Sequence, residues 1–521
     1  MSTWSRRDFL QFIGVSGAAA TIAGCSLQDN KRIVSLKPSS DDDVKLIDGL
    51  SYQVLIKEGD VINSKGEMFG HNNDYTALLP IPGKSENEKI LWVNHEYPNF
   101  KITWLKEASK EEADKQIAAC GGSLIHIKKL DSGHWQFVKN SPYNKRIDGK
   151  TLFKFADNVK IQGQSTAKGT FANCSGGTTP WNTVLTCEEN YDNFVGEYEF
   201  SSYYDESSDK IKNGWMQWEK FYPEMSPLHY GWVVEIDPLT GKGKKLTGLG
   251  RFAHESATCV NTAKTPVVYS GDDRDQQFIY KFVSDEKNSL DRGTLYVADI
   301  VHGKWLPMDL EKSPILKKTF KTNLDVRIFA RLAAKILGAT PMNRPEDIAV
   351  NTLTHDIYVS LTKSKSKDDP YGSILRIQEK NGDHHATEFK SSTFVFGGEK
   401  SAISCPDNLE FDPNHNLWVT NDISGKSIGK GKYEKFKNNG LFSIPTMGVN
   451  AGKVFQIASA PTHAEFTGPT FTKDAKTLFL SVQHPGELSK PDKFTSDWPV
   501  RKEEPKSAVI TITGPAFDKS T

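Results

Sequence analysis

The chain has 521 residues, and its 65 Lys and Arg balance its 65 Asp and Glu, so the formal net charge is zero. This balance excludes a protein that binds polyanions through bulk positive charge, and we expect no nucleic-acid partner. Hydrophobic residues make up 37% of the chain, which excludes a bundle of membrane-spanning helices and indicates a globular protein with a large core. We expect a monomer.

The first residues are typical of a twin-arginine export signal. Arg6 and Arg7 stand just ahead of Phe9 and Leu10, and a short stretch rich in Gly and Ala follows. That stretch is too short to span a bilayer stably. Proteins exported in the folded state often carry cofactors that are inserted before transport, so this signal favours a metal site.

A lipidation site is predicted at Cys25, because the residues just before it resemble a bacterial lipoprotein cleavage site. A lipid on Cys25 would anchor the protein to a membrane, whereas simple cleavage nearby would leave it free. Both alternatives place the protein in the periplasm or cell envelope, exported by the twin-arginine machinery. The expected parts are a signal peptide at residues 1–24, a tether at residues 25–44 and one folded domain at residues 45–521.

The cysteines indicate a thiol that is not in a disulfide. Six are present, at positions 25, 120, 174, 187, 259 and 405, and no two are spaced as Cys-x-x-Cys. This spacing excludes a zinc ribbon. If Cys25 is lipidated, five remain, so at least one thiol is free, buried or bound to a metal.

Short runs of β-branched and aromatic residues fill the chain and predict an all-β protein. A repeat is visible in the C-terminal half, where Tyr358, Trp418 and Phe479 each stand at the centre of a predicted strand, 60 and 61 residues apart. A period of this kind predicts a β-propeller of about 4–8 blades, whereas a β-sandwich, the alternative, predicts none. Two segments, Leu105–Ala119 and Val326–Leu337, are predicted to be small helical insertions.

Three acids occupy equivalent places in the repeat. Glu255, Glu346 and Asp407 each come just ahead of a strand that would run near the propeller axis. Equivalent positions of different blades converge on one mouth of the central channel. Carboxylates brought together there would repel one another unless cations hold them.

Other groups with ligand-type or phosphate-binding side chains end or begin predicted strands. Each has a structural alternative when taken alone: a buried Cys is usually inert, paired Asp residues often form turns, and an Arg beside a Glu is often a surface ion pair. A thiolate suits iron or zinc, carboxylates suit calcium, and a guanidinium suits phosphate. Because Pro345 follows Arg344, we expect the backbone of Arg344 to be extended. The candidates are Glu96, Cys187, Glu188, Glu189, Asp272, Asp273 and Arg344.

Several strings resemble the PhoX-type alkaline phosphatases, in order, from about Gly70 to Trp498. They include NCSGGTTPWNTVLTCEEN at residues 173–190, GRFAHE at 250–255, LGATPMNRPEDI at 337–348 and QHPGE at 483–487. The resemblance implies a periplasmic phosphomonoesterase with a β-propeller fold, which hydrolyses phosphate esters with Ca²⁺ and Fe³⁺ held at the channel mouth. Residues 45–521 would then be the phosphatase domain.

The resemblance also implies a role for each candidate residue. Cys187 would bind iron, with Glu255 and Glu346 beside it. Arg344 would hold the phosphate oxygens, and Arg344 and Glu346 would be the catalytic residues. The remaining oxygen ligands would be Glu96, Glu188, Glu189, Asp272 and Asp273. His95 and His484 are either acids or ligands, or are structural.

The sequence departs from the family pattern at Ser256, Asn408 and Val500, which bears on the number of calcium ions and on the substrate range. Two other functions stay open. A calcium-dependent propeller lactonase or phosphotriesterase would share the acidic channel but would not need Cys187 or Arg344. A lipid-anchored propeller used only for binding would keep the strands without the ligand set. No Walker loop occurs, and a metal cluster, which needs no Ser nucleophile, remains the favoured source of catalysis.

Overall fold

The computed structural model describes residues 34–99, 109–200 and 211–518. Arg6, Arg7 and Cys25 lie outside the described residues. Everything described belongs to one compact unit, which begins at Val34. Within the described residues, no helix is long and apolar enough to cross a membrane.

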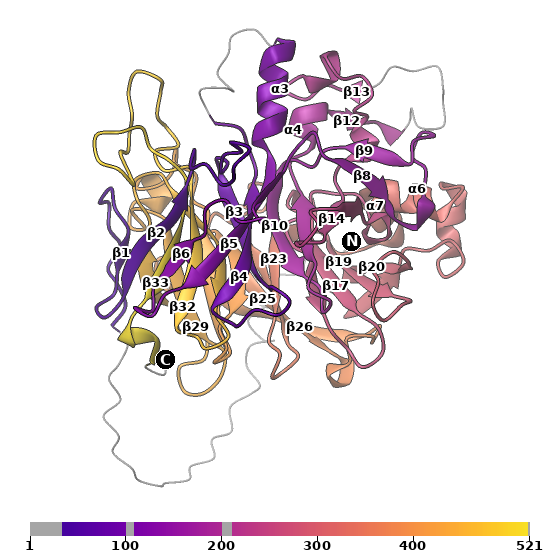
Figure 1. The fold of residues 1–521 in the computed structure, drawn as a ribbon. Coiled ribbons are helices and arrows are strands. Elements are labelled where there is room, and N and C mark those ends of the chain that lie inside the picture. Colours follow the sequence, from indigo (N-terminus) through magenta and orange to yellow (C-terminus); the bar gives the residue numbers. More distant parts are fainter. Residues whose placement is uncertain (1–33, 100–108, 201–210, 519–521) are drawn as a thin grey trace. The chain divides into compact units, whose positions relative to one another are not determined.

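Six β-sheets of four to six strands form the blades of a propeller (Figure 1). The first blade contains β3 (Asn73–Pro80), β4 (Glu88–His95), β5 (Gly121–Lys129) and β6 (Trp135–Phe137), with β7 (Lys145–Ile147) also paired to β5. The second contains β10 (Asn173–Thr178), β11 (Val184–Glu188), β14 (Val233–Ile236), β15 (Gly243–Lys245), β8 (Leu152–Phe155) and β9 (Thr166–Lys168). The third contains β16 (Thr258–Val260), β17 (Val267–Gly271), β19 (Ile279–Ser284), β20 (Gly293–Asp299) and β21 (Lys304–Pro307).

The fourth, fifth and sixth blades come from the C-terminal half. The fourth contains β23 (Pro345–Val350), β24 (Ile357–Leu361), β25 (Ser373–Glu379) and β26 (Phe389–Phe396). The fifth contains β27 (Pro406–Phe411), β28 (Asn416–Asn421), β29 (Gly440–Pro445), β30 (Phe455–Ser459) and β1 (Lys45–Leu46). The sixth contains β31 (Glu465–Phe471), β32 (Thr477–Gln483), β33 (Ala508–Thr513) and β2 (Ser51–Lys57). Two further pairs are β12 (Glu197–Tyr198) with β13 (Ile211–Lys212) and β18 (Asp275–Gln277) with β22 (Met342–Asn343).

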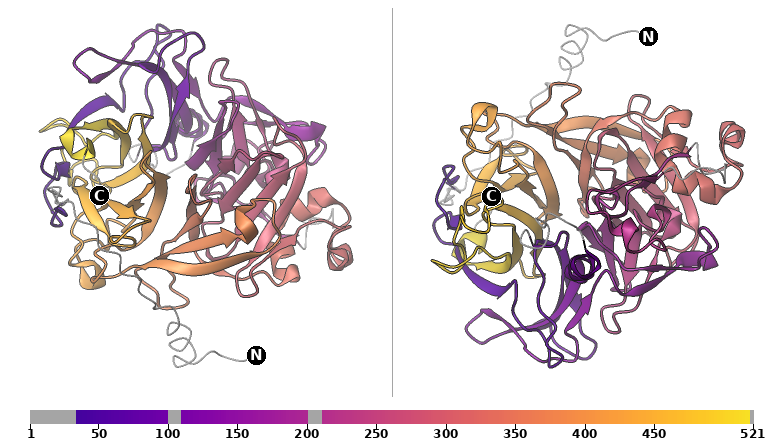
Figure 2. Two further views of the ribbon diagram at one scale, coloured as in Figure 1. Left: turned by 90° about the horizontal axis from the view of Figure 1, so that it is seen from below. Right: turned by 90° about the horizontal axis from the view of Figure 1, so that it is seen from above.

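The innermost strands of the six blades close into a ring. β3, β10, β16, β23, β27 and β31 contact one another in that order, and β31 returns to contact β3. Figure 2 shows the sheets arranged around this axis. The sixth blade is completed by β2, which pairs antiparallel with β33. A strand from the N-terminal part of the chain thus joins the C-terminal blade. The predicted all-β propeller is confirmed.

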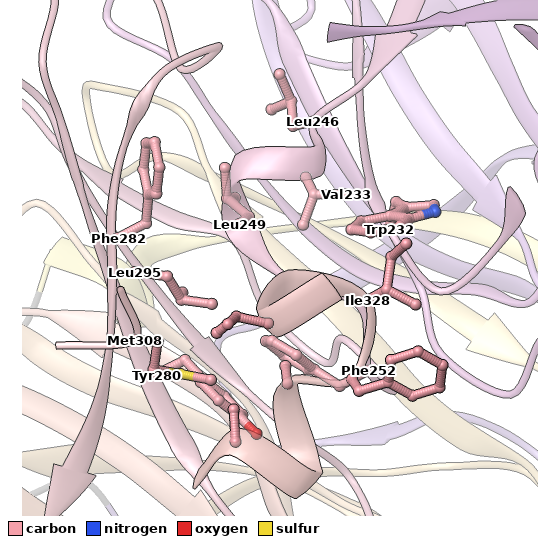
Figure 3. Close-up of a cluster of buried hydrophobic side chains, with 14 of the residues drawn as sticks. Trp232, Val233, Leu246, Leu249, Phe252, Tyr280, Phe282, Leu295, Met308 and Ile328 are labelled. Carbon is pink, nitrogen blue, oxygen red and sulfur yellow. The ribbon is translucent and has the colours of Figure 1, made fainter. Parts of the chain in front are cut away.

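The blades pack through apolar side chains that alternate along each strand. Tyr358, Trp418 and Phe479, which define the sequence period, are all buried in the second strands of their blades. The largest cluster joins the second and third blades, and Figure 3 shows part of it. The residues labelled there are Trp232, Val233, Leu246, Leu249, Phe252, Tyr280, Phe282, Leu295, Met308 and Ile328.

The helices differ in detail from the prediction. The first, α3 (Lys110–Ala119), begins after Ser109, whose side chain accepts a hydrogen bond from the backbone N–H of Glu112. The second predicted helix is two, α6 (Asn323–Ile328) and α7 (Ala330–Leu337), because the backbone at Phe329 leaves helical angles at φ −109° and ψ 47°. A short helix, α4 (Asp192–Val195), follows the second blade's β11.

The last part of the predicted tether belongs to the folded unit. The backbone N–H of Leu36 donates to the carbonyl of Gln456, and Asp42 accepts from the hydroxyl of Ser496 at 2.7 Å. Residues 34–44 therefore lie along the fifth and sixth blades, and the folded unit starts about ten residues earlier than the sequence indicates.

Candidate metal and phosphate site

Four inner strands begin with the same backbone arrangement. A residue with positive φ precedes each strand: Asn72 (53°), Ala172 (54°), Arg344 (46°) and Cys405 (51°). The register of the first ladder then shifts across the next residues, which marks a β-bulge. Bulges and positive φ re-aim side chains and often occur at functional sites. The residues placed in this way are Asp74, Cys174, Glu346 and Asp407.

These strand starts lie together at one end of the ring, which we call the acidic mouth. The expectation that Arg344 would be extended is wrong, because its φ is 46° although Pro345 follows. Cys405 shares the same conformation ahead of Pro406. Left-handed backbone at a residue other than glycine costs about 1–3 kcal/mol, so the surrounding blades must hold both residues in place.

A group of three buried side chains at the acidic mouth has the composition and spacing of a metal site. One ligand atom each from Cys174, Glu189 and Glu255 lies within 4.8 Å of the others. The Cys174 side chain is 3% exposed, Glu189 3% and Glu255 6%. Burial, and then the carboxylates of Glu189 and Asp407, raise the pKa of Glu255 well above its usual value. Nη1 of Arg274 lies 3.1 Å from Oε1 of Glu189 and compensates that carboxylate in part. A bound cation would relieve the remaining negative charge of this buried group.

The thiol in this group is not the one that the sequence analysis selected. Cys187 is also fully buried and belongs to the same apolar cluster as Cys174, but the three-residue group found among the described residues contains Cys174 and not Cys187. Cys174 reaches the carboxylates because the bulge in β10 turns its side chain toward them. The geometry thus favours Cys174 as the thiolate ligand, and the role predicted for Cys187 stays a prediction.

Glu188 and Asp272 have cationic partners of their own instead of joining the three-residue group. Glu188 accepts from Nζ of Lys245 at 2.6 Å and from the backbone N–H groups of Gly231 and Trp232. Asp272 accepts from Nε of Arg331 at 2.8 Å and from Nη2 of the same guanidinium. Both carboxylates therefore have buried or half-buried cationic partners in this structure, and their predicted role as metal ligands stays a prediction.

Arg344 lies at the acidic mouth and is held by two acids. Its Nε is 2.7 Å from Oδ1 of Asp273, and its Nη2 is 2.5 Å from Oδ2 of Asp273 and 2.7 Å from Oε1 of Glu346. Burial opposes ionisation of Asp273, but the Arg344 guanidinium outweighs it and lowers the pKa of Asp273. Nη1 remains, with its shortest ion-pair distance of 4.0 Å to Asp422. The Arg344 side chain as a whole is 24% exposed.

Further acids complete the acidic mouth. Glu96 accepts from Asn72 and Gln483, and burial raises its pKa to about 7. Two buried carboxylate oxygens, Oδ1 of Asp74 and Oε2 of Glu346, have no hydrogen-bond partner among the described residues. Orphaned oxygens of this kind are costly unless a ligand satisfies them. Asp407, Asp422 and Glu465 also interact electrostatically with this group.

The two histidines have different surroundings. His95 is fully buried, with Nε2 2.7 Å from Oγ of Ser123 and Nδ1 3.1 Å from the carbonyl of His71, which is a structural position. His484 lies at the acidic mouth, where its Nε2 is 3.3 Å from Oε2 of Glu465.

Two of the residues at which the chain departs from the family pattern, Ser256 and Asn408, form hydrogen bonds in the structure. The Oγ of Ser256 accepts from the backbone N–H of Gly271. The amide of Asn408 donates to Asp407 at 3.1 Å and accepts from the backbone N–H of Gly468 at 2.8 Å. Asn408 thus fixes the orientation of one carboxylate of the acidic mouth. No contact explains Val500.

Sequence reasoning missed Cys174 and Asp74. A signal was available, because Asn173-Cys174 and Asn73-Asp74 occupy the same place in their blades as Pro345-Glu346 and Pro406-Asp407. The repeat is clearest in the sequence of the C-terminal half, where the Pro residues mark the register.

Comparison with known proteins agrees with this arrangement. A profile of the family described as alkaline phosphatase PhoX matches residues 32–486. The chain belongs to the PhoX family of alkaline phosphatases. It is 30% identical to Pseudomonas fluorescens PhoX, whose structure is in complex with vanadate, a transition-state analogue. The TM-score is 0.83, and the match covers 93% of this chain and 98% of that chain.

Other solved structures are more distant from this PhoX family member. The periplasmic gluconolactonase PpgL of Pseudomonas aeruginosa has 8% identity and a TM-score of 0.35, covering 89% of this chain and 99% of that chain. The gluconolactonase XC5397 of Xanthomonas campestris has 9% identity and a TM-score of 0.30, covering 85% and 97%. Among curated proteins, no sequence matches this chain significantly. As a PhoX family member, the protein is a phosphoric monoester hydrolase.

Proposed function

We propose that this protein is an exported alkaline phosphatase that hydrolyses phosphomonoesters with Ca²⁺ and Fe³⁺ at the acidic mouth. The observation that carries the proposal is the group of Cys174, Glu189 and Glu255 at the same mouth as Arg344. A thiolate among carboxylates suits iron, and the surplus of carboxylate oxygens suits calcium.

The donor set fits such metals by its chemistry. The buried acids exceed the cations beside them, and the orphaned oxygens of Asp74 and Glu346 need a positive partner. Cys174, Glu189 and Glu255 would hold one ion, and Asp74, Glu96, Glu346 and Asp407 would supply oxygens for others. Bound ions would polarise the phosphoryl oxygens, provide an oxygen nucleophile and neutralise charge in the transition state.

The protein's own part is to bind and orient the ester. Arg344 keeps Nη1 turned away from Asp273, so it can donate to a phosphoryl oxygen without breaking its ion pair. Asp273 and Glu346 restrict the guanidinium to one orientation, which limits the entropy lost when substrate binds. Arg344 and Glu346 are the residues to which we assign catalytic roles.

We further propose that the enzyme acts in the periplasm or cell envelope. The twin-arginine pattern at Arg6 and Arg7 supports export of the folded protein, and the motif that ends at Cys25 supports a lipid anchor. A lactonase or a binding propeller would need neither the Cys174 thiol nor Arg344 at the acidic mouth.

Metal analysis and turnover on one preparation test the proposal. The protein would be exported through its own signal, purified, and analysed for iron and calcium, with p-nitrophenyl phosphate as substrate. We expect both metals, turnover at alkaline pH, and loss of activity when a chelator removes calcium. A preparation that holds iron and calcium but does not release phosphate would contradict the proposed activity. Full turnover without either metal would contradict the proposed site.

A further inference from the structure

Two lysine-rich loops border the acidic mouth, although the chain as a whole is neutral. Residues 362–372 follow β24, and residues 422–439 follow β28, so both loops leave their blades at the acidic mouth. Together they contain eight Lys and four Asp or Glu. The two loops therefore carry a net positive charge, and we call them the lysine rim.

The two loops form one packed unit. The rings of Tyr371, Tyr433 and Phe436 contact one another, with centroids 6.0–6.5 Å apart. The Tyr433 hydroxyl donates to the carbonyl of Pro370 at 2.7 Å. These contacts join the loops of the fourth and fifth blades, so the rim presents its lysines from a shared apolar support.

Lys363 connects the lysine rim to the proposed phosphate site. Its Nζ lies 3.6 Å from Oδ2 of Asp422, and Nη1 of Arg344 lies 4.0 Å from the same oxygen. Both cations are partly exposed, at 25% and 24%. Arg344 and Lys363 thus share one carboxylate, which joins the proposed phosphate site to the lysine rim.

Most of the outer lysines have no acid beside them. Lys365, Lys367, Lys426 and Lys430 are exposed and form no ion pair with any residue in the described part of the chain. Lys432 does pair, with Asp368 at 3.6 Å, and Lys435 pairs with Glu399 at 2.5 Å. Unpaired lysines around a mouth attract anions, and lysine side chains adapt to different anion positions.

We propose that the lysine rim binds a second anionic group of the substrate, so that the preferred substrates are phosphomonoesters whose leaving group carries another phosphate. This inference rests on the proposed phosphatase function and names its substrate class. The acidic mouth needs its metals to accept even one phosphate, and a second phosphate would meet carboxylates if it lay inside. On the rim it meets ammonium groups. The rim would raise the rate of productive encounter and hold the leaving group, both of which increase kcat/KM.

The test compares fructose 1,6-bisphosphate with fructose 6-phosphate, using phosphate release by the metal-loaded enzyme. The variants are Lys365→Gln/Lys367→Gln and Lys426→Gln/Lys430→Gln. The matched control is Lys242→Gln/Lys287→Gln, which removes two exposed lysines from turns at the far ends of the second and third blades. We expect each rim variant to lose about tenfold in kcat/KM for the bisphosphate and less than twofold for the monophosphate. The control should change neither.

Ionic strength gives a second measurement. The wild-type preference for the bisphosphate should shrink as salt rises from about 0.01 M to 0.5 M, because screening weakens the exposed lysines. Equal losses on both substrates, or unchanged bisphosphate kinetics in the rim variants, would overturn the inference. If wild-type protein hydrolyses neither substrate nor p-nitrophenyl phosphate, the proposed function itself fails; normal monophosphate turnover without a lysine-dependent preference defeats only the lysine rim.

Discussion

The guanidinium of Arg344 donates two hydrogen bonds to the carboxylate of Asp273, which belongs to the neighbouring blade. Nε and Nη2 of Arg344 face Oδ1 and Oδ2 of Asp273 at 2.7 and 2.5 Å. Asp273 follows β17 of the third blade, while Arg344 precedes β23 of the fourth. The ion pair therefore links two blades and leaves Nη1 outside the contact with Asp273.

Replacing Arg344 with Lys should impair catalysis severely. An ammonium group cannot keep both contacts to Asp273 and also donate to a phosphoryl oxygen, because it is a point charge without the planar fork. We expect kcat/KM to fall by about 10²–10³, which corresponds to roughly 3–4 kcal/mol of transition-state stabilisation. Inorganic phosphate should inhibit the variant less, and its metal content should be unchanged. Near-normal turnover with unchanged phosphate inhibition would show that Arg344 is only structural.

Asp273→Asn tests the orientation of Arg344 separately. The Asn side chain has one acceptor oxygen where Asp273 has two, so it cannot accept both hydrogen bonds from Arg344. The guanidinium should therefore become mobile while keeping its charge. We expect kcat to fall by about tenfold, less than in Arg344→Lys, because lost positioning costs less than a lost contact. Steady-state kinetics on p-nitrophenyl phosphate measures this. A loss of metal from Asp273→Asn would instead support the predicted role of Asp273 as a metal ligand.

The two buried cysteines of the second blade should behave differently. Cys174→Ser replaces a soft donor beside Glu189 and Glu255 with a harder and weaker one, so iron and activity should be lost while calcium is retained. Cys187→Ala is the matched control: it removes an apolar contact and should lower the free energy of unfolding by about 1 kcal/mol without changing iron content. Elemental analysis and chemical unfolding of both variants decide the assignment. Iron lost from Cys187→Ala and kept in Cys174→Ser would reverse it.

The buried ion pair of Lys245 and Glu188 should be structural. Both side chains are 0% exposed, and Nζ is 2.6 Å from Oε1. Lys245→Met leaves a buried carboxylate without a cation, and we expect the free energy of unfolding to fall by about 3–5 kcal/mol. Lys245→Met combined with Glu188→Leu should recover most of that loss and keep the metals. Metal loss in a folded double variant would make Glu188 a ligand after all.

His229 should make the protein less stable in acid. Burial lowers the pKa of His229 to about 4, and Lys245 and Arg251 act in the same direction against a hydrogen bond to the carbonyl of Ile161. The unfolded chain, with a His pKa of about 6.5, binds more protons than the folded one between pH 6.5 and 4, so stability falls as the pH falls through this range.

Urea unfolding at pH 7 and pH 5 measures this contribution. In His229→Gln, the difference in the free energy of unfolding between the two pH values should be smaller than in wild type by about 1–2 kcal/mol. The reference is wild-type protein in the same buffers. An unchanged difference would mean that His229 is protonated in the folded state.

The sequence by itself determined the fold class and the family. Strand composition and the spacing of Tyr358, Trp418 and Phe479 predict stacked blades, because each blade must bury the same central side chain against its neighbours. Acids at equivalent places, such as Glu346 and Asp407, predict a shared mouth for the same reason. Motifs in series identify the PhoX family without any coordinates.

Only the tertiary structure decided which side chains meet at that mouth. Cys174 and Cys187 lie on paired strands of one blade, and composition does not distinguish them; the bulge in β10 and the positive φ of Ala172 turn Cys174 toward Glu189 and Glu255. The structure also shows that Lys245 lies beside Glu188 and Arg331 beside Asp272. These partners are 57 and 59 residues away in sequence. Local pattern carries no information about such long-range pairs, because they form only when separate strands and blades pack together.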